Sequence, residues 1–148
     1  MYWLISNHAA CGGIFRDHLG TFLGAFSCNL GHATVFSSDV QGIIFALEFA
    51  AHHGWTNIWL ESDSSIALVV FKSPSLVPIM LRNRWHNACR LGVQVISSHI
   101  YREGNVCAAR WANMGHSNTR AVWHSMLPPD LGRDFFRDRC GLPSYRFP

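Results

Sequence analysis

Long apolar runs are absent from this sequence of 148 residues. Its longest unbroken apolar stretch, "IALVVF" at residues 66–71, is far shorter than the roughly 20 residues that span a bilayer. The first residues, "MYWLIS", lack the basic start that is typical of a secretory signal. We therefore expect a soluble, intracellular protein without a membrane partner.

Paired cysteines are absent as well. The five cysteines are odd in number, widely scattered and never arranged as C-x-x-C: Cys11, Cys28, Cys89, Cys107 and Cys140. This pattern indicates neither a disulfide framework nor a zinc knuckle, and we expect the cysteines to be small buried side chains. The pairs His52-His53 and His86-x-x-Cys89 lack a second pair at ligand spacing, which argues against a zinc site.

Lysine is nearly absent: the chain, of net charge +3, contains eleven arginines and a single lysine, Lys72. Arginine is suited to planar, bidentate contacts with phosphate, so this bias favours a polyanionic partner. A solvated basic surface without a specific partner accounts for the charge equally well.

Apolar residues, by contrast, are plentiful enough for one domain. Hydrophobic residues make up 49% of the chain and aromatic residues 13%, which provides a core and excludes a disordered chain. We assign residues 1–116 to this domain. From residue 117 to 148 the pattern breaks into a proline-bounded tail, for which we predict one short helix near residues 130–139.

The spacing of apolar residues predicts an α/β protein with the element order β-β-α-β-α-α-β-α. The expected strands are 9–16 and 21–28, joined as a hairpin, then a short apolar strand in 56–65 that runs into Ser and Asp, and 93–103. The expected helices are 36–54, 64–73, 77–92 and one that begins at an Asn105 cap. Gly54 and Pro74 are the predicted stop signals of the first two helices.

Two carboxylates occupy positions that suggest a metal site. Ser38 and Gln41 form a capping-box pattern, which predicts that Asp39 lies in the first helical turn. Asp63 follows a short apolar strand, at the edge where open α/β sheets place their ligands. Oxygen ligands there suit Mg²⁺. Alternatively, Asp39 complements a helix dipole and Asp63 caps the next helix.

Three stretches carry a resemblance to a known family. "GGIFRDHLGTFLGAFSCNLG", "LESDSS" and "HIYREGN" are similar in order and spacing to the plant ribonuclease H-like domains of retroelement-derived reverse transcriptase proteins. The likeness runs from about residue 9 to 115, and "LPPDLGRD" and "GLPSYRF" resemble extensions in that group. It implies a mixed five-stranded sheet flanked by helices.

The resemblance also implies a chemistry, namely cleavage of the RNA strand of RNA–DNA hybrids by four carboxylates that hold two Mg²⁺ ions. By position, Asp63 matches a strand-end Asp of the family, and Asp39 stands where the family has a helix Glu. Ala109 stands where the family's final helix carries Asp. The family's first Asp lies upstream of the glycine-rich stretch, and here no acid precedes Asp17. Two of the four expected carboxylates are therefore absent.

The family's first strand lies at the centre of its sheet, and in this chain it is missing or replaced by residues 1–5. Unpaired backbone groups left in the interior would cost roughly 1–3 kcal/mol each. We therefore expect residues 2–5 to occupy this place, joined to the strand at 9–16 by a tight "SNH" turn.

Other residues of the resembling motifs have less specific roles. His99 matches a histidine common in the last motif, and its place in a strand favours packing or hydrogen bonding over catalysis. Arg82, Arg84, Trp85 and Arg90 share one predicted helix and are candidates for contacts with a hybrid. A solvated helix face explains the arginines nearly as well, and Trp85 also suits the core.

Three functions remain open at this point. The first is a Mg²⁺-dependent hybrid nuclease, and the second is a degenerate domain that keeps the fold and nucleic-acid affinity but has lost turnover. The third is a protein-interaction module that uses the aromatic residues Phe135, Phe136 and Tyr145 of the tail.

Overall fold

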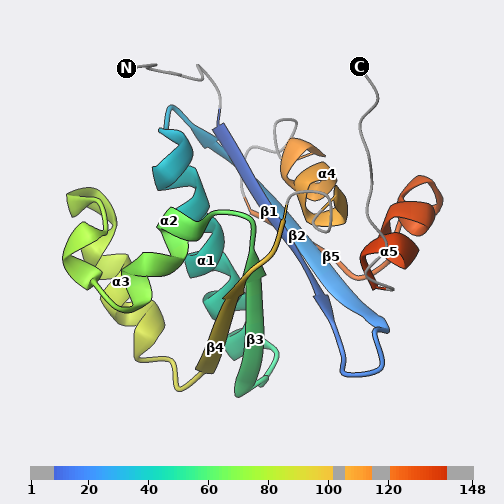
Figure 1. Cartoon of the computed structure of the whole chain (residues 1–148), viewed down its shortest axis with the longest axis horizontal. Helices are drawn as coiled ribbons and strands as arrows, with labels where there is room; N and C mark the ends of the chain where they lie inside the picture. Colours follow the sequence, from blue (N-terminus) through green and yellow to red (C-terminus); the bar gives the residue numbers. More distant parts are fainter. Residues whose placement is uncertain (1–8, 102–105, 115–120, 140–148) are drawn as a thin grey trace.

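The protein is an α/β domain in the computed structural model, which describes residues 9–101, 106–114 and 121–139 (Figure 1). The helices and strands are β1 (Ala9–Arg16), β2 (Phe22–Gly31), α1 (Val35–His52), β3 (Asn57–Ser62), α2 (Ser65–Leu68), α3 (Arg82–Cys89), β4 (Gln94–His99), α4 (Val106–Met114), β5 (Val122–His124) and α5 (Gly132–Arg139). The predicted fold class and the predicted order of the first eight elements are confirmed.

The described strands form two sheets rather than one. β1 and β2 pair antiparallel as a hairpin, and β5 joins the other edge of β2, also antiparallel. β3 and β4 form a separate parallel pair. The predicted strand at residues 2–5 lies outside the described residues, so that expectation stays a prediction.

Helix α1 packs against both sheets and carries the main core. Its buried apolar residues recur at helical spacing: Val40, Ile43, Ile44, Leu47 and Ala50. All of these except Ala50 form one cluster with residues of α2, α3, β3 and β4. Phe45 and Phe49, on another side of the same helix, pack against β1 and β2. Gly54, with φ of +74°, ends the helix in the left-handed region, as its sequence position predicts.

The predicted capping box is wrong, because α1 begins one turn earlier. Thr34 is the N-cap, and its hydroxyl accepts a hydrogen bond from the Ser37 backbone N–H at 3.0 Å. Ser38 is instead a buried helical residue whose Oγ donates to the Thr34 carbonyl oxygen at 2.9 Å. Asp39 therefore lies in the second helical turn.

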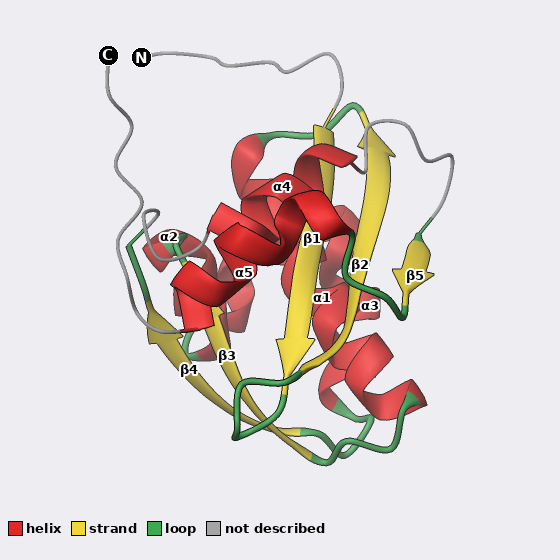
Figure 2. Ribbon diagram, turned by 90° about the vertical axis from the view of Figure 1, so that its right-hand side faces the viewer, coloured by secondary structure: helices red, strands yellow, loops and turns green. Residues whose placement is uncertain are grey.

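Helix α4 lies on the face of the β1–β2 hairpin opposite α1, and α5 packs beside α4 (Figure 2). Trp111 of α4 is fully buried and forms a cluster with Ala25 of β2 and with Leu131 and Phe135 of the tail. The predicted tail helix is therefore observed as α5, and it packs on the domain. Sequence periodicity did not predict the three-residue strand β5.

The cysteines follow the prediction only in part. Cys11 and Cys28 face each other across β1 and β2, and both are buried and free. Burial raises the pKa of the Cys11 thiol to about 12. Cys89 is exposed at the end of α3, so its predicted burial is wrong. The side chains of Cys107 and Cys140 lie outside the part of the chain that the structure describes.

None of the described helices combines the length and the apolar character that a bilayer-spanning helix needs.

Candidate functional site

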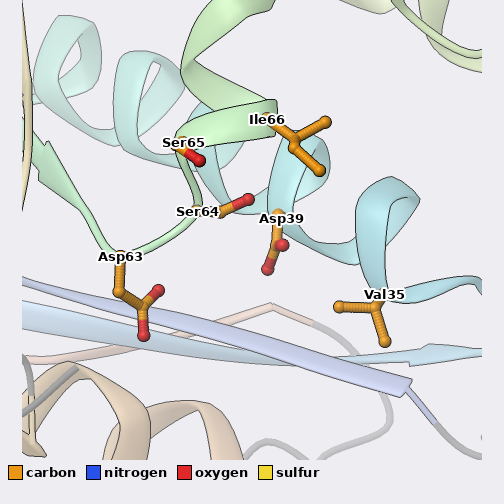
Figure 3. A pocket seen from close by; sticks show the side chains of 6 residues that line it. All are labelled: Val35, Asp39, Asp63, Ser64, Ser65 and Ile66. Carbon is orange, nitrogen blue, oxygen red and sulfur yellow. The ribbon is translucent and has the colours of Figure 1, made fainter. Parts of the chain in front are cut away.

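Asp39 and Asp63 come together in one pocket, as the sequence predicts (Figure 3). The pocket has a volume of about 280 Å³ and is lined by Val35, Asp39, Asp63, Ser64, Ser65 and Ile66. Both carboxylates point toward the same side of the pocket, where the strands of the three-stranded sheet pass (Figure 3). The pocket therefore combines two acids from segments far apart in sequence.

Asp39 reaches the pocket because of the phase of α1. The neighbouring residues Ser38 and Val40 are buried, whereas Asp39 is half-buried at the margin of the buried face. Val35 lies four residues earlier and therefore on the same side of the helix, where it lines the pocket as an exposed apolar residue. Asp39 thus lines the pocket although the predicted cap is absent.

Asp63 lies directly after the last residue of β3, as predicted, in the turn that leads into α2. It does not cap this helix. The N-cap is Ser64, whose hydroxyl accepts a hydrogen bond from the Ala67 backbone N–H at 3.2 Å. The Ser64 backbone N–H in turn donates to Ser62 Oγ at 3.1 Å. These bonds define a tight turn that carries the Asp63 carboxylate.

The turn is also tied to the neighbouring strand. Nε2 of His99, the last residue of β4, lies 3.2 Å from the carbonyl oxygen of Asp63. The His99 ring packs edge-on against Tyr101, with ring centroids 5.6 Å apart. The predicted hydrogen-bonding role of His99 is confirmed.

The types of ligand atom in the pocket suit a hard cation. Carboxylate and hydroxyl oxygens are the ligands that Mg²⁺ accepts, and Asp39, Asp63 and the nearby serines supply them. Among the described residues, however, no group of three or more His, Cys, Asp or Glu side chains is placed to hold a metal ion. The described donors therefore fit part of one ion's coordination sphere.

Ala109 lies in α4, which packs on β1 and β2. The Asn105 cap predicted for this helix lies outside the described residues. The helix itself is present where the resemblance places it, so the position at which the family carries Asp belongs to a formed element.

The four nucleic-acid candidates have very different surroundings. Trp85 is 2% exposed and packs edge-on against Phe71, which confirms the core alternative for this residue. Arg84 is half-buried, forms two hydrogen bonds to the Glu48 carboxylate at 2.8 and 2.9 Å, and lies 4.3 Å from the centroid of the Phe45 ring. The Trp85 indole and the Arg84 guanidinium are thus both engaged in contacts within the protein.

Arg82 and Arg90 are exposed at opposite ends of α3. Arg82 donates to the carbonyl oxygens of Val77 and Ser75 at 3.1 and 3.0 Å, which holds the turn before the helix. Arg90 follows the last residue of α3. Of the four candidates, these two are exposed, and the Arg82 guanidinium is engaged in its two backbone hydrogen bonds.

Two features of the site were not predicted from the sequence. Ile66 and Val35 give the pocket an apolar margin, which no motif indicates. Ser64 is the cap of α2, and the "SDSS" stretch does contain that signal, because a serine three residues before the Ala67 N–H is a typical N-cap.

The aromatic residues of the tail, which were candidates for a protein-interaction surface, do not share one environment. Phe135 is 8% exposed and packs edge-on against Phe22, with ring centroids 5.9 Å apart. Phe136 is exposed, and Tyr145 lies outside the described residues. Phe135 thus contributes to the core rather than to an exposed patch.

Comparisons with known proteins agree with this architecture. The model of the family described as reverse transcriptase-like matches residues 5–115. The Arabidopsis thaliana protein named "Putative ribonuclease H protein At1g65750" is 29% identical over 133 residues, which cover 88% of this chain and 22% of that protein. The chain therefore spans about a fifth of the length of this relative.

Solved structures show the same fold. The ribonuclease H1 of Halobacterium salinarum has a TM-score of 0.64 and 27% identity, over 74% of this chain and 88% of that one. LC11 ribonuclease H1, solved in complex with an RNA/DNA hybrid, has a TM-score of 0.61 and 18% identity, over 74% and 94% of the two chains. The resemblance read from the three sequence motifs is confirmed, and the chain belongs to the reverse transcriptase-like family, with a ribonuclease H-like domain.

Proposed function

We propose that this domain binds RNA–DNA hybrids and that it cleaves their RNA strand poorly or not at all. The observation that carries the proposal is the pocket, in which Asp39 and Asp63 are the acids among the described lining residues. Ala109 adds to it, because the sequence has alanine at the position of α4 where the resemblance implies a carboxylate. The domain thus keeps the binding architecture and lacks part of the catalytic ligand set.

Asp39 and Asp63 are the residues that would hold a Mg²⁺ ion. When bound in such a pocket, the ion supplies electrostatic stabilisation of the charge that develops on phosphate oxygens. The chain's own contribution is to present both carboxylates from the fixed ends of α1 and β3. A second ion would need further ligands, and Ala109 removes one of them. Weak binding of the metal follows.

Support for hybrid binding comes from fold and charge. LC11 ribonuclease H1, which shares this fold, was solved with an RNA/DNA hybrid. In the present chain the net charge is +3, and Arg82 and Arg90 are exposed on α3. Arginines that contact phosphates release counterions, so we expect binding with little sequence preference and a strong dependence on salt.

The binding test compares arginines with different surroundings. Fluorescence anisotropy with a labelled hybrid should show an affinity that falls steeply between low and high salt. Arg90→Ala should lower the affinity, because its guanidinium is exposed, and should reduce the salt dependence by the equivalent of about one phosphate contact. Arg84→Met is the matched control in the same helix, because its guanidinium is held by Glu48.

Two results would contradict the binding proposal. One is the lack of measurable affinity for the hybrid at low salt, and the other is an affinity that does not change with salt. Equal losses in Arg90→Ala and Arg84→Met would contradict the assignment of a phosphate contact to Arg90, because removal of either positive charge would then have the same effect.

A further inference from the structure

The His99 side chain links the end of β4 to the turn at Asp63, which the backbone hydrogen bonds between β3 and β4 do not reach. Its Cα is the register partner of Ser62, the last residue of β3, and the Ile100 backbone N–H donates to the Ser62 carbonyl oxygen at 3.0 Å. The parallel ladder therefore reaches to the end of β3 and stops before Asp63. The His99 side chain continues the connection, because its Nε2 lies 3.2 Å from the Asp63 carbonyl oxygen.

A carbonyl oxygen only accepts hydrogen bonds, so His99 must donate through Nε2 in this contact. Neutral His99 is then the tautomer with hydrogen on Nε2. The edge-on packing of its ring against Tyr101 favours this orientation. With Nε2 directed at the backbone, this nitrogen is engaged in the turn and is not directed at a phosphate.

The turn at Asp63 contains hydrogen bonds of its own, and the hydrogen bond from His99 differs from them because it connects the turn to another strand. The bonds to Ser62 Oγ and Ser64 Oγ hold the turn to itself and to the start of α2. The bond from His99 fixes the turn relative to β4, the strand next to β3. Since the orientation of the Asp63 peptide sets the direction of its side chain, this bond bears on where the carboxylate points.

We propose that His99 is a positioning residue, which donates a hydrogen bond to the Asp63 backbone and thereby holds the Asp63 carboxylate toward the pocket. The functional role of this positioning rests on the proposed function, in which Asp63 holds a metal ion. The hydrogen bond itself, and its effect on the turn, do not depend on the proposed function.

The first test uses the unmodified protein. Nitrogen-15 chemical shifts of the histidine rings distinguish a protonated Nε2 from a protonated Nδ1. We expect His99 to be the Nε2–H tautomer at neutral pH when its ring is uncharged. A predominant Nδ1–H tautomer would overturn the proposal, because an unprotonated Nε2 has no hydrogen to donate.

The second test uses two matched variants. His99→Gln keeps an N–H donor and removes the ring, whereas His99→Phe keeps a ring to pack on Tyr101 and removes the donor. In amide hydrogen exchange, the Ala67 and Leu68 amides, which bond to Ser64, should exchange at least about tenfold faster in His99→Phe and near the wild-type rate in His99→Gln. The Ile44 and Leu47 amides of α1 are the internal control. Equal exchange in both variants would overturn the role of the donor.

A paramagnetic probe separates this inference from the proposed function. Mn²⁺ should broaden the amide signals of Asp63 and Ser64 in the wild type and in His99→Gln, and less so in His99→Phe at the same concentration. If Mn²⁺ has no effect on the wild type while exchange still depends on the donor, the positioning by His99 stands and the metal part of the proposed function fails.

Discussion

Arg84 and Arg90 have the same side chain on neighbouring turns of one helix region, and their surroundings give them different roles. Arg84 is enclosed by Glu48 and Phe45 of α1, and the hydrogen bond to Glu48 raises the pKa of its guanidinium. Arg90 lies beyond the end of α3 and is exposed. The sequence could not separate them, because Glu48 is 36 residues away from Arg84 along the chain.

Arg84→Met should lower the free energy of unfolding by about 1 kcal/mol. The change keeps an apolar stem over Phe45 and removes a bidentate ion pair, which is worth this much at a partly exposed site. Chemical denaturation at two salt concentrations measures it, and the difference should shrink at high salt. Glu48→Gln should give a loss in the same direction. A variant as stable as the wild type would show that the pair does not hold α3 to α1.

Cys11 should make the protein less stable in alkali. Burial and the neighbouring Cys28 thiol raise the pKa of Cys11 from 9.0 to about 12 in the folded state. Between these values the unfolded chain has lost a proton that the folded chain keeps, so the free energy of unfolding falls as pH rises. At pH 10 the loss from this thiol is about 1.4 kcal/mol relative to neutral pH.

Denaturant titrations at pH 7 and pH 10 check this prediction. Cys11→Val removes the ionisable group, so it should lose less stability between the two pH values than the wild type does. Cys89→Ala is the comparison. Burial raises the pKa of the Cys89 thiol as well, but less than that of Cys11, so this variant should follow the wild type more closely than Cys11→Val does. A steeper pH dependence in Cys11→Val than in the wild type would contradict the assignment.

Among the elements, apolar periodicity predicted the helices and strands well, whereas local capping signals misled. Thr34-x-x-Ser37 and Ser38-x-x-Gln41 both resemble helix starts, and they differ by one turn. The earlier start is adopted in a fold that buries Ser38 together with Val40 against the core. The periodic pattern is built from apolar residues, so it does not indicate that the polar residue Ser38 is buried. The sequence therefore could not decide between the two caps.

Strand β5 illustrates a different limit of prediction from sequence. β5 has three residues, too few for a periodic pattern, and its position depends on β2, nearly a hundred residues earlier in the chain. Its attachment includes the contact between Ser27 Oγ and His124 Nε2 at 3.1 Å. Burial lowers the pKa of His124, which favours its neutral ring in this contact. Only the tertiary structure places these groups together.

Two glycines test the close packing of α4 and the looser packing of α1 around β1. A Cβ at Gly12 would lie against the backbone nitrogen of Ala112 in α4 and 2.7 Å from its Cα. A Cβ at Gly42 in α1 would make an ordinary contact, 3.6 Å from the Cβ of Cys11. Gly12→Ala should therefore lower the free energy of unfolding by about 1–3 kcal/mol, since backbone must move.

Gly42→Ala is the matched control, and it should raise the free energy of unfolding by about 0.5–1 kcal/mol, because alanine favours a helix interior more than glycine does. Thermal and denaturant unfolding of both variants give the comparison. Equal stability of the two variants would contradict the close approach of α4 to β1.

For the whole molecule, the resemblance to a known family predicted that Asp39 and Asp63 lie near each other, and both line one pocket. Spacing alone left open that Asp39 complements a helix dipole and that Asp63 caps a helix, and the cap it predicted for α1 was wrong. The burial of Trp85 and the pairing of Arg84 were not predictable, because they depend on which face of α3 meets α1. Sequence motifs therefore located the pocket better than they located the binding surface.

The interface between the two sheets is the feature that most concerns activity. Arg16 of β1 and Glu61 of β3 form an ion pair at 3.3 Å across it, and α1 packs against strands on both sides. Because Asp39 and Asp63 are the acids among the described residues that line the pocket, a single added carboxylate in Ala109→Asp should restore little cleavage.

The central claim is that this domain retains the fold of a hybrid nuclease without its turnover. The most direct measurement is the initial rate at which the purified chain cleaves an RNA–DNA hybrid in Mg²⁺, compared with Asp63→Asn prepared in the same way. Each 1.36 kcal/mol of lost transition-state stabilisation lowers the rate about tenfold, and we expect a pocket lined by the two described acids Asp39 and Asp63 to lack several such steps. We predict that both proteins give the same background rate. Rapid Mg²⁺-dependent cleavage by the wild type that Asp63→Asn abolishes would contradict the claim.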